Sequence, residues 1–67
     1  MTKFKYLQKV RVKNGVRDGF YSGSEGTILT RKDIVIDAQT LKTAYMVELQ
    51  YGRGETFYEE EIEAVEI

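Results

Sequence analysis

The sequence predicts a small all-β domain of five short strands. Three observations lead to this prediction: apolar residues are spaced mostly by two, the chain contains no proline, and its six glycines fall between the alternating segments. A period of two is the pattern of a half-buried strand, and glycine permits the backbone angles that tight turns require. With 67 residues the chain has room for one domain, expected to span residues 1–67.

The first strand is expected within residues 6–13. Val10 and Val12 share its inward face, and the cations at positions 9, 11 and 13 share the other. Residues 14–25 should form one long structured loop, because Asn-Gly, Asp-Gly and Ser-Gly pairs recur there and allow backbone angles that other residues resist.

A second strand opens at residues 26–32, where β-branched side chains favour the pleat. Its pattern can continue through Ile34 and Ile36. Residues 37–42 carry mixed signals, and three alternatives stay open for them: a turn, a short helical turn, or the tip of a hairpin.

The third strand, residues 44–51, alternates most cleanly. The side chains expected on its inward face are Tyr45, Val47, Leu49 and Tyr51. The outward side chains are Met46, Glu48 and Gln50. Gly52-Arg53-Gly54 then supplies a tight reversal into a short fourth strand over residues 55–58.

The acidic run Glu59-Glu60-Glu61 indicates one turn of helix before a last strand that contains Ile62, Val65 and Ile67. A glutamate-rich helix from Glu59 to the end is the competing interpretation, because Ile62 and Val65 also lie three residues apart. This segment is short for an isolated helix, so tertiary pairing should decide between the two.

Five short strands, a long loop after the first and a one-turn link before the last describe a small SH3-like barrel. Closing the sheet into a barrel removes its exposed edges. The segment from Phe20 to Ile28 resembles the KOW motif of ribosomal and transcription-elongation proteins: aromatic, any residue, Gly, two residues, Gly, any residue, hydrophobic. The tail from Phe57 to Val65 is similar to the closing strand of many SH3-like barrels.

In the KOW-like segment, Gly23 and Gly26 are expected to flank a turn in which the chain reverses without Cβ clashes. Phe20 and Ile28 can then pack onto the barrel interior. KOW domains that bind ribosomal RNA are usually basic, whereas this chain has 10 basic and 11 acidic residues and a net charge of −1. The overall charge therefore gives no support to strong non-specific nucleic-acid binding.

The charges are distributed unevenly, with most cations before residue 33 and most acids after it. In SH3-like barrels the first and last strands usually lie side by side, so much of this asymmetry should be local pairing. The cations expected to face acids in this way are Lys9, Arg11 and Lys13. Their expected partners are Glu61, Glu63 and Glu66.

The composition argues against an enzyme and against bound cofactors. The chain has no Cys and no His, which removes disulfides and the usual ligands of zinc, haem and iron–sulfur sites. Ser22 and Ser24 have no evident base to activate them. The run at residues 59–61 with Glu63 is expected to be a solvated acidic turn rather than a Ca²⁺ or Mg²⁺ site.

No membrane partner is expected. The sequence holds no apolar run of the roughly 18 residues that span a bilayer, and its start lacks the apolar stretch of a signal peptide. We therefore expect a cytoplasmic protein.

The leading hypothesis is a non-catalytic interaction module that binds a protein partner, as a small modulator or an accessory subunit of a larger complex. Its size is similar to that of the small accessory proteins of phages. The alternative is a KOW-like RNA- or DNA-binding domain acting in translation or transcription, in which cations contact phosphate and rings stack on bases. Tyr45 and Phe57 are expected in the core. The candidate binding residues are Arg17, Phe20, Tyr21, Arg31, Lys32, Tyr51, Arg53 and Tyr58.

Overall fold

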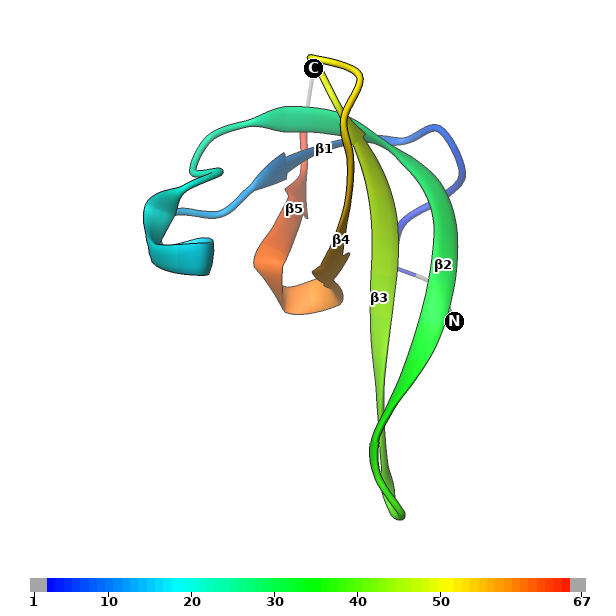
Figure 1. Ribbon diagram of the computed structural model, residues 1–67. Helices are drawn as coiled ribbons and strands as arrows, with labels where there is room; N and C mark the ends of the chain where they lie inside the picture. The colour runs from blue at the N-terminus through cyan, green and yellow to red at the C-terminus, as the bar shows by residue number, and fades with distance from the viewer. Residues whose placement is uncertain (1–2, 66–67) are drawn as a thin grey trace.

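The computed structural model describes residues 3–65 and contains five strands in one antiparallel sheet (Figure 1). The strands are β1 (Lys9–Val12), β2 (Glu25–Asp37), β3 (Thr40–Leu49), β4 (Gly54–Tyr58) and β5 (Ile62–Ala64). Two short 3-10 turns, η1 (Val16–Gly19) and η2 (Glu59–Glu61), interrupt them. The predicted all-β class is therefore confirmed, and so is the single helical turn before the last strand.

The sheet has the strand order β4-β3-β2-β1-β5, and β2 arches over the molecule in Figure 1. The chain passes from β4 to β5 through η2, which the Glu61 carboxylate stabilises by accepting a 2.7 Å hydrogen bond from the Tyr58 N–H. Within residues 3–65 no backbone ladder joins β4 to β5, so backbone hydrogen bonds do not close the sheet into a barrel.

The core collects one apolar face of every strand, together with side chains from the N-terminal segment and the long loop. Val47 and Leu49 on β3 and Ile28 on β2 are buried, as the alternating pattern predicts. The Tyr45 ring packs edge-on against Phe4, and its hydroxyl donates to Glu59 at 3.1 Å. The full set is Phe4, Val10, Val12, Tyr21, Ile28, Tyr45, Val47, Leu49, Phe57 and Ile62.

β1 and β5 lie side by side, as predicted, with Arg11 opposite Glu63 and an ion pair of 3.7 Å between them. Arg11 also contacts Glu25 on β2 at 3.2 Å. Lys13 lies beside Glu61 in η2, whose carbonyl accepts a 3.0 Å hydrogen bond from the Lys13 N–H, but no ion pair joins their side chains among the described residues. Lys9 Nζ lies 3.9 Å from the Glu25 carboxylate. Glu66 and Ile67 lie outside the described residues.

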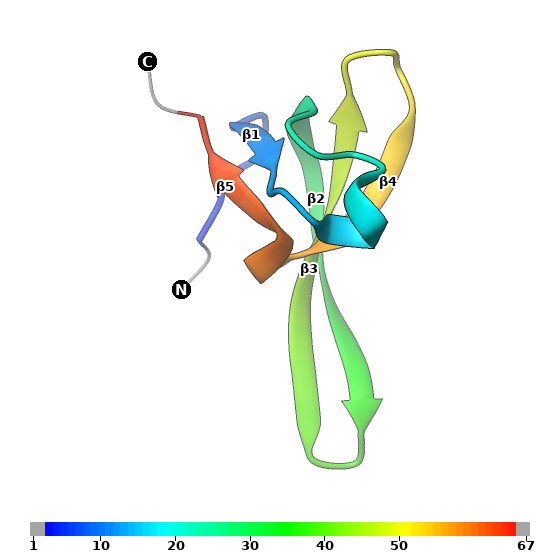
Figure 2. The same cartoon turned by 90° about the vertical axis from the view of Figure 1, so that its left-hand side faces the viewer.

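β2 and β3 continue past the rest of the sheet as a two-stranded hairpin, which projects downward in Figures 1 and 2. We call residues 30–43 the arm. Of the three alternatives for residues 37–42, the hairpin tip is correct, and β3 begins at Thr40 rather than at residue 44. The Asp37 carboxylate accepts a 2.9 Å hydrogen bond from the Gln39 N–H at the tip, which satisfies a turn donor.

Two aromatic side chains lie where the pattern did not place them. Tyr51 is 71% exposed because β3 ends at Leu49 and the Gly52 N–H donates back to the Leu49 carbonyl at 2.8 Å, so the alternation no longer applies. Phe20 is 77% exposed, and Tyr21 is buried in its place. Tyr21 can be buried because its hydroxyl has a hydrogen-bond partner.

The two glycines of the KOW-like segment have different roles. Gly23 has a φ of +77° and lies in the turn, as expected. Gly26 lies inside β2, opposite Leu49, and not at the turn. A Cβ on Gly26 would come within 2.6 Å of both the Glu48 carbonyl oxygen and Val47 Cγ1. Glycine is therefore required there by the close approach of β3.

Candidate functional site

Four of the predicted binding residues gather around one carboxylate. Glu55, at the start of β4, lies on the inward side of the sheet edge with a side chain only 20% exposed. Tyr21 donates its hydroxyl to Glu55 Oε1 at 2.7 Å, Arg53 Nε donates to the same oxygen at 3.1 Å, and Arg17 Nη1 lies 3.5 Å from Oε2. Phe20 joins the group by packing edge-on against Tyr21, at 4.7 Å between centroids.

These contacts fix the ionisation of the site. The Tyr21 hydrogen bond, helped by the two guanidinium groups, holds the pKa of Glu55 below its ordinary value. The same hydrogen bond raises the pKa of the Tyr21 hydroxyl. At neutral pH the site therefore holds an ionised carboxylate in contact with two guanidinium groups, those of Arg17 and Arg53, and these three groups together carry one positive charge.

Arg17 is held in place on three sides. Its guanidinium carbon lies 4.6 Å from the Phe57 ring centroid and 5.7 Å from that of Tyr21, and its Nη2 donates to the Thr56 carbonyl. Its backbone has a φ of +52°, and that of Asp18 has +60°, both rare for residues with a side chain. Local backbone strain of this kind clusters at functional sites, where the surrounding contacts maintain it.

The remaining candidates lie elsewhere. Arg31 is on the arm, paired with Asp33 at 3.2 Å, and Lys32 is its neighbour. The Tyr58 ring lies under Lys42 Nζ, 4.5 Å from its centroid, at the base of the arm. Tyr51 is exposed in the β3–β4 turn, where its hydroxyl lies 3.4 Å from Ser24 Oγ. The candidate binding residues are thus not gathered at one place, which nucleic-acid binding through all of their cations and rings would require.

One hollow lies between the residues around Glu55 and Tyr58 at the base of the arm. It has a volume of about 210 Å³ and lies between the η1 loop, the end of β4 and the base of the arm. Arg17 and Tyr58, both predicted binding residues, lie on its wall. The complete lining is Arg17, Ile34, Ala44, Thr56, Tyr58 and Glu61.

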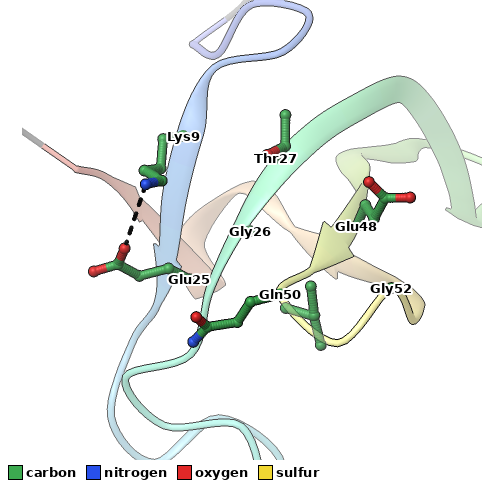
Figure 3. A pocket seen from close by; sticks show the side chains of 8 residues that line it. Lys9, Glu25, Gly26, Thr27, Glu48, Gln50 and Gly52 are labelled. Carbon is green, nitrogen blue, oxygen red and sulfur yellow. Dashed lines mark ion pairs between the residues drawn. The ribbon is translucent and has the colours of Figure 1, made fainter.

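A second hollow, of about 330 Å³, lies over β1, β2 and the end of β3 (Figure 3). Lys9 and Glu25 face each other at one side of it, and Glu48 lies at the opposite side. Gly26 and Gly52 supply bare backbone to its lining.

Sequence reasoning missed Glu55 and the functional contact of Phe57. The signal for Glu55 was present: it lies two residues before the buried Phe57, which places an acid on the inward face of the same strand. A carboxylate at an inward position requires partners, and Tyr21, Arg17 and Arg53 are those partners.

Acid should destabilise the fold through Glu55. Because its pKa is lowered on folding, Glu55 contributes stability above its ordinary pKa of 4.5, and that contribution is lost as the pH falls through the lowered folded value. We expect Glu55→Gln to flatten the acid limb of thermal stability measured by circular dichroism. Tyr21→Phe should flatten it partly. An unchanged acid limb in Glu55→Gln would contradict the role of these contacts.

Within residues 3–65 no helical segment is long and apolar enough to cross a bilayer, and no group of three or more acidic side chains is placed to hold a metal ion. Comparison of the chain with models of protein families, with curated proteins and with solved structures found no match. The function must therefore be argued from the chemistry of the surface itself.

Proposed function

We propose that this protein is a non-catalytic, protein-binding module, acting as a small modulator or accessory subunit of a larger complex. The observation that carries the proposal is the hollow lined by Arg17 and Tyr58, continued through the Tyr21 ring to the exposed Phe20. We call Arg17, Phe20 and Tyr58 with this hollow the recognition surface. Aromatic and arginine side chains beside a concave apolar site are the groups that dominate protein–protein binding energy.

The ion pairs favour a protein partner over nucleic acid. Arg17 and Arg53 both contact Glu55, and Arg31 contacts Asp33. Cations already paired with carboxylates offer little charge to phosphates, whose neutralisation supplies most of the affinity for RNA or DNA. The alternative function is therefore KOW-like binding of RNA or DNA. The test below would reveal it as partner binding that becomes stronger at low salt.

We further propose that the sheet is an SH3-like barrel. Three features support this proposal: the long loop after β1, the single turn η2 before β5, and the pairing of the first strand with the last. The resemblance of residues 20–28 to the KOW motif agrees at Gly23, which lies in the turn, and at Ile28, which is buried, but not at Gly26, which lies within β2. It differs at Phe20, whose side chain points to solvent.

Phe20→Ala is expected to abolish partner recovery in a native pull-down from the source cells, with a loss of at least about tenfold, typical of a central aromatic contact. The fold should be unaffected because the ring is 77% exposed. The matched control is Tyr6→Ala, which removes an equally exposed ring, 71%, from the N-terminal segment. Samples are compared with and without nuclease.

The proposal is supported if the wild type and Tyr6→Ala both recover the same protein, Phe20→Ala does not, and nuclease leaves the recovery unchanged. Equal recovery by both variants overturns the recognition surface. If nuclease abolishes recovery of the partner, the nucleic-acid alternative is favoured. Arg17→Ala should then weaken binding to the nucleic acid, by an amount that depends on salt concentration.

A further inference from the structure

The arm has two open edges. Hydrogen bonds between β2 and the segment before it end at Ile28, and β4 pairs with β3 only from Ala44 onward. Between residues 30 and 43, each strand of the arm therefore has a backbone partner on one side only among the described residues, and Figures 1 and 2 both show the hairpin standing clear of the other strands. An open strand edge presents unpaired N–H and C=O groups that can pair with another chain.

The arm also exposes apolar side chains. Val35 is 69% exposed, Leu41 opposite it is 66% exposed, and Ile36 is 47% exposed. A two-stranded hairpin is marginally stable in water unless further strands or a packed face support it. An open edge with adjacent apolar surface is thus a candidate for pairing with an additional strand.

The charges along the β2 edge are complementary to themselves. The edge reads Lys32-Asp33-Ile34-Val35-Ile36-Asp37, with a cation at one end and an acid at the other. In an antiparallel pair of two such edges, Lys32 of each copy comes opposite Asp37 of the other. A parallel pair would instead place Lys32 opposite Lys32, which is unfavourable.

The bulge in β2 makes this pairing geometrically consistent. Lys32 is opposite Ala44 and Asp37 is opposite Thr40, so both face the same side of the arm although they are five residues apart. This is possible because the ladder shifts register between Val35 and Asp37, which leaves Ile36 as the extra residue. If Ile36 and Asp37 are counted together as one position, the edge from Lys32 to Asp37 has five positions, and Ile34 is the third and central one.

We propose that the arm is a self-association site, at which the β2 edge pairs antiparallel with the same edge of a second copy. The two-fold axis passes beside Ile34, so the two Ile34 side chains meet at the centre and a Lys32–Asp37 pair closes each end. Such an interface is isologous, as in most homodimers. Lys32 is available for it, since none of the ion pairs within residues 3–65 includes this residue.

The expected dimer is weak. Six edge residues a copy bury less than the roughly 1,000 Å² of a stable interface, so association should be reversible and depend on concentration. The measurement is sedimentation velocity of the full chain over a range of concentrations at low salt. Lys32→Glu and Asp37→Lys should each weaken dimerisation by about tenfold, because each places like charges opposite one another at both ends.

The decisive sample is an equimolar mixture of the two variants. In the mixed dimer, the carboxylate introduced at position 32 meets the ammonium introduced at position 37, and the native Lys32 and Asp37 meet at the other end. Association should therefore return to near the wild-type level. A third variant, Asp37→Asn, keeps the oxygen that accepts from the Gln39 N–H and separates loss of charge from loss of the turn contact.

Circular dichroism establishes that each variant is folded. A wild type that stays monomeric at its highest soluble concentration overturns the proposal. So does a dimer that neither single variant weakens, or a mixture that stays as weakly associated as its components. Ile34 also lines the hollow of the recognition surface, so the two proposals are distinguished by Phe20→Ala, which changes no residue of the arm.

Discussion

Gly26→Ala is expected to remove most of the free energy that holds this protein folded. Gly26 is the second residue of β2 and is paired with β1 on one side and with β3 on the other. Its added methyl group would lie 2.6 Å from the Glu48 carbonyl oxygen, a backbone atom that cannot rotate away. Relief of the clash requires β2 to move away from β3 at this end of their ladder, where β2 is also paired with β1, so the centre of the sheet is disturbed.

We expect a loss of about 3 kcal/mol or more, at the upper end of the cost of overpacking. A core of this size rarely supplies more than about 3–5 kcal/mol, so much of the variant should be unfolded at 25 °C. Urea unfolding followed by circular dichroism measures the loss. The control is Gly54→Ala in β4, where an added Cβ meets nothing within 4 Å and φ is not positive. Equal stabilities for the two variants would contradict the argument.

The elements that were predicted correctly are those with uninterrupted alternation. Tyr45, Val47 and Leu49 follow one another at a spacing of two inside a strand, and all three are buried. Tyr51 continues the same spacing but lies beyond the last strand hydrogen bond, so it is exposed. Periodicity identifies the face of a strand, whereas the end of the strand is set by turn hydrogen bonds that the pattern does not contain.

The long loop was harder to predict because its side-chain directions depend on backbone angles. Phe20 and Tyr21 are adjacent aromatics, and hydrophobicity alone favours burial of the phenylalanine. Positive φ angles at Arg17, Asp18 and Gly19 redirect the chain just before them. The half-buried partner Glu55, 34 residues from Tyr21, then favours the tyrosine. The alternation of apolar residues contains neither the backbone angles nor the contact with the distant Glu55.

The sequence predicted only part of the candidate site, because its grouping also depends on contacts between segments that are distant in the chain. The residue types were informative, since aromatic and arginine side chains in glycine-rich turns do gather around Glu55. Their grouping depended on which turns share one end of the sheet. Arg31 and Lys32 follow directly from β2, but the length of that strand places them on the arm, where Arg31 pairs with Asp33 and not with Glu55. That length depends on the pairing of β2 with β3, which alternation in one strand does not specify.

Phe57→Ala should have the second largest effect, because Phe57 joins the core to the recognition surface. Its ring is fully buried, packs edge-on against Tyr21 at 5.7 Å, and lies beneath the Arg17 guanidinium. Truncation leaves a cavity and should cost about 3–5 kcal/mol. The matched control is Phe20→Ala, the same chemical change at a ring that is 77% exposed, for which we expect almost no loss.

Phe57→Leu separates the two roles of this ring. Leucine keeps most of the buried apolar volume, so the variant should lose only about 1–2 kcal/mol and remain folded. It removes the aromatic face on which Arg17 rests, so partner recovery should fall while Tyr6→Ala retains it. Undiminished binding by folded Phe57→Leu would mean that Arg17 is held by Glu55 and the Thr56 carbonyl alone. Reduced binding would mean that the buried Phe57 ring holds the Arg17 guanidinium in the position that the partner recognises.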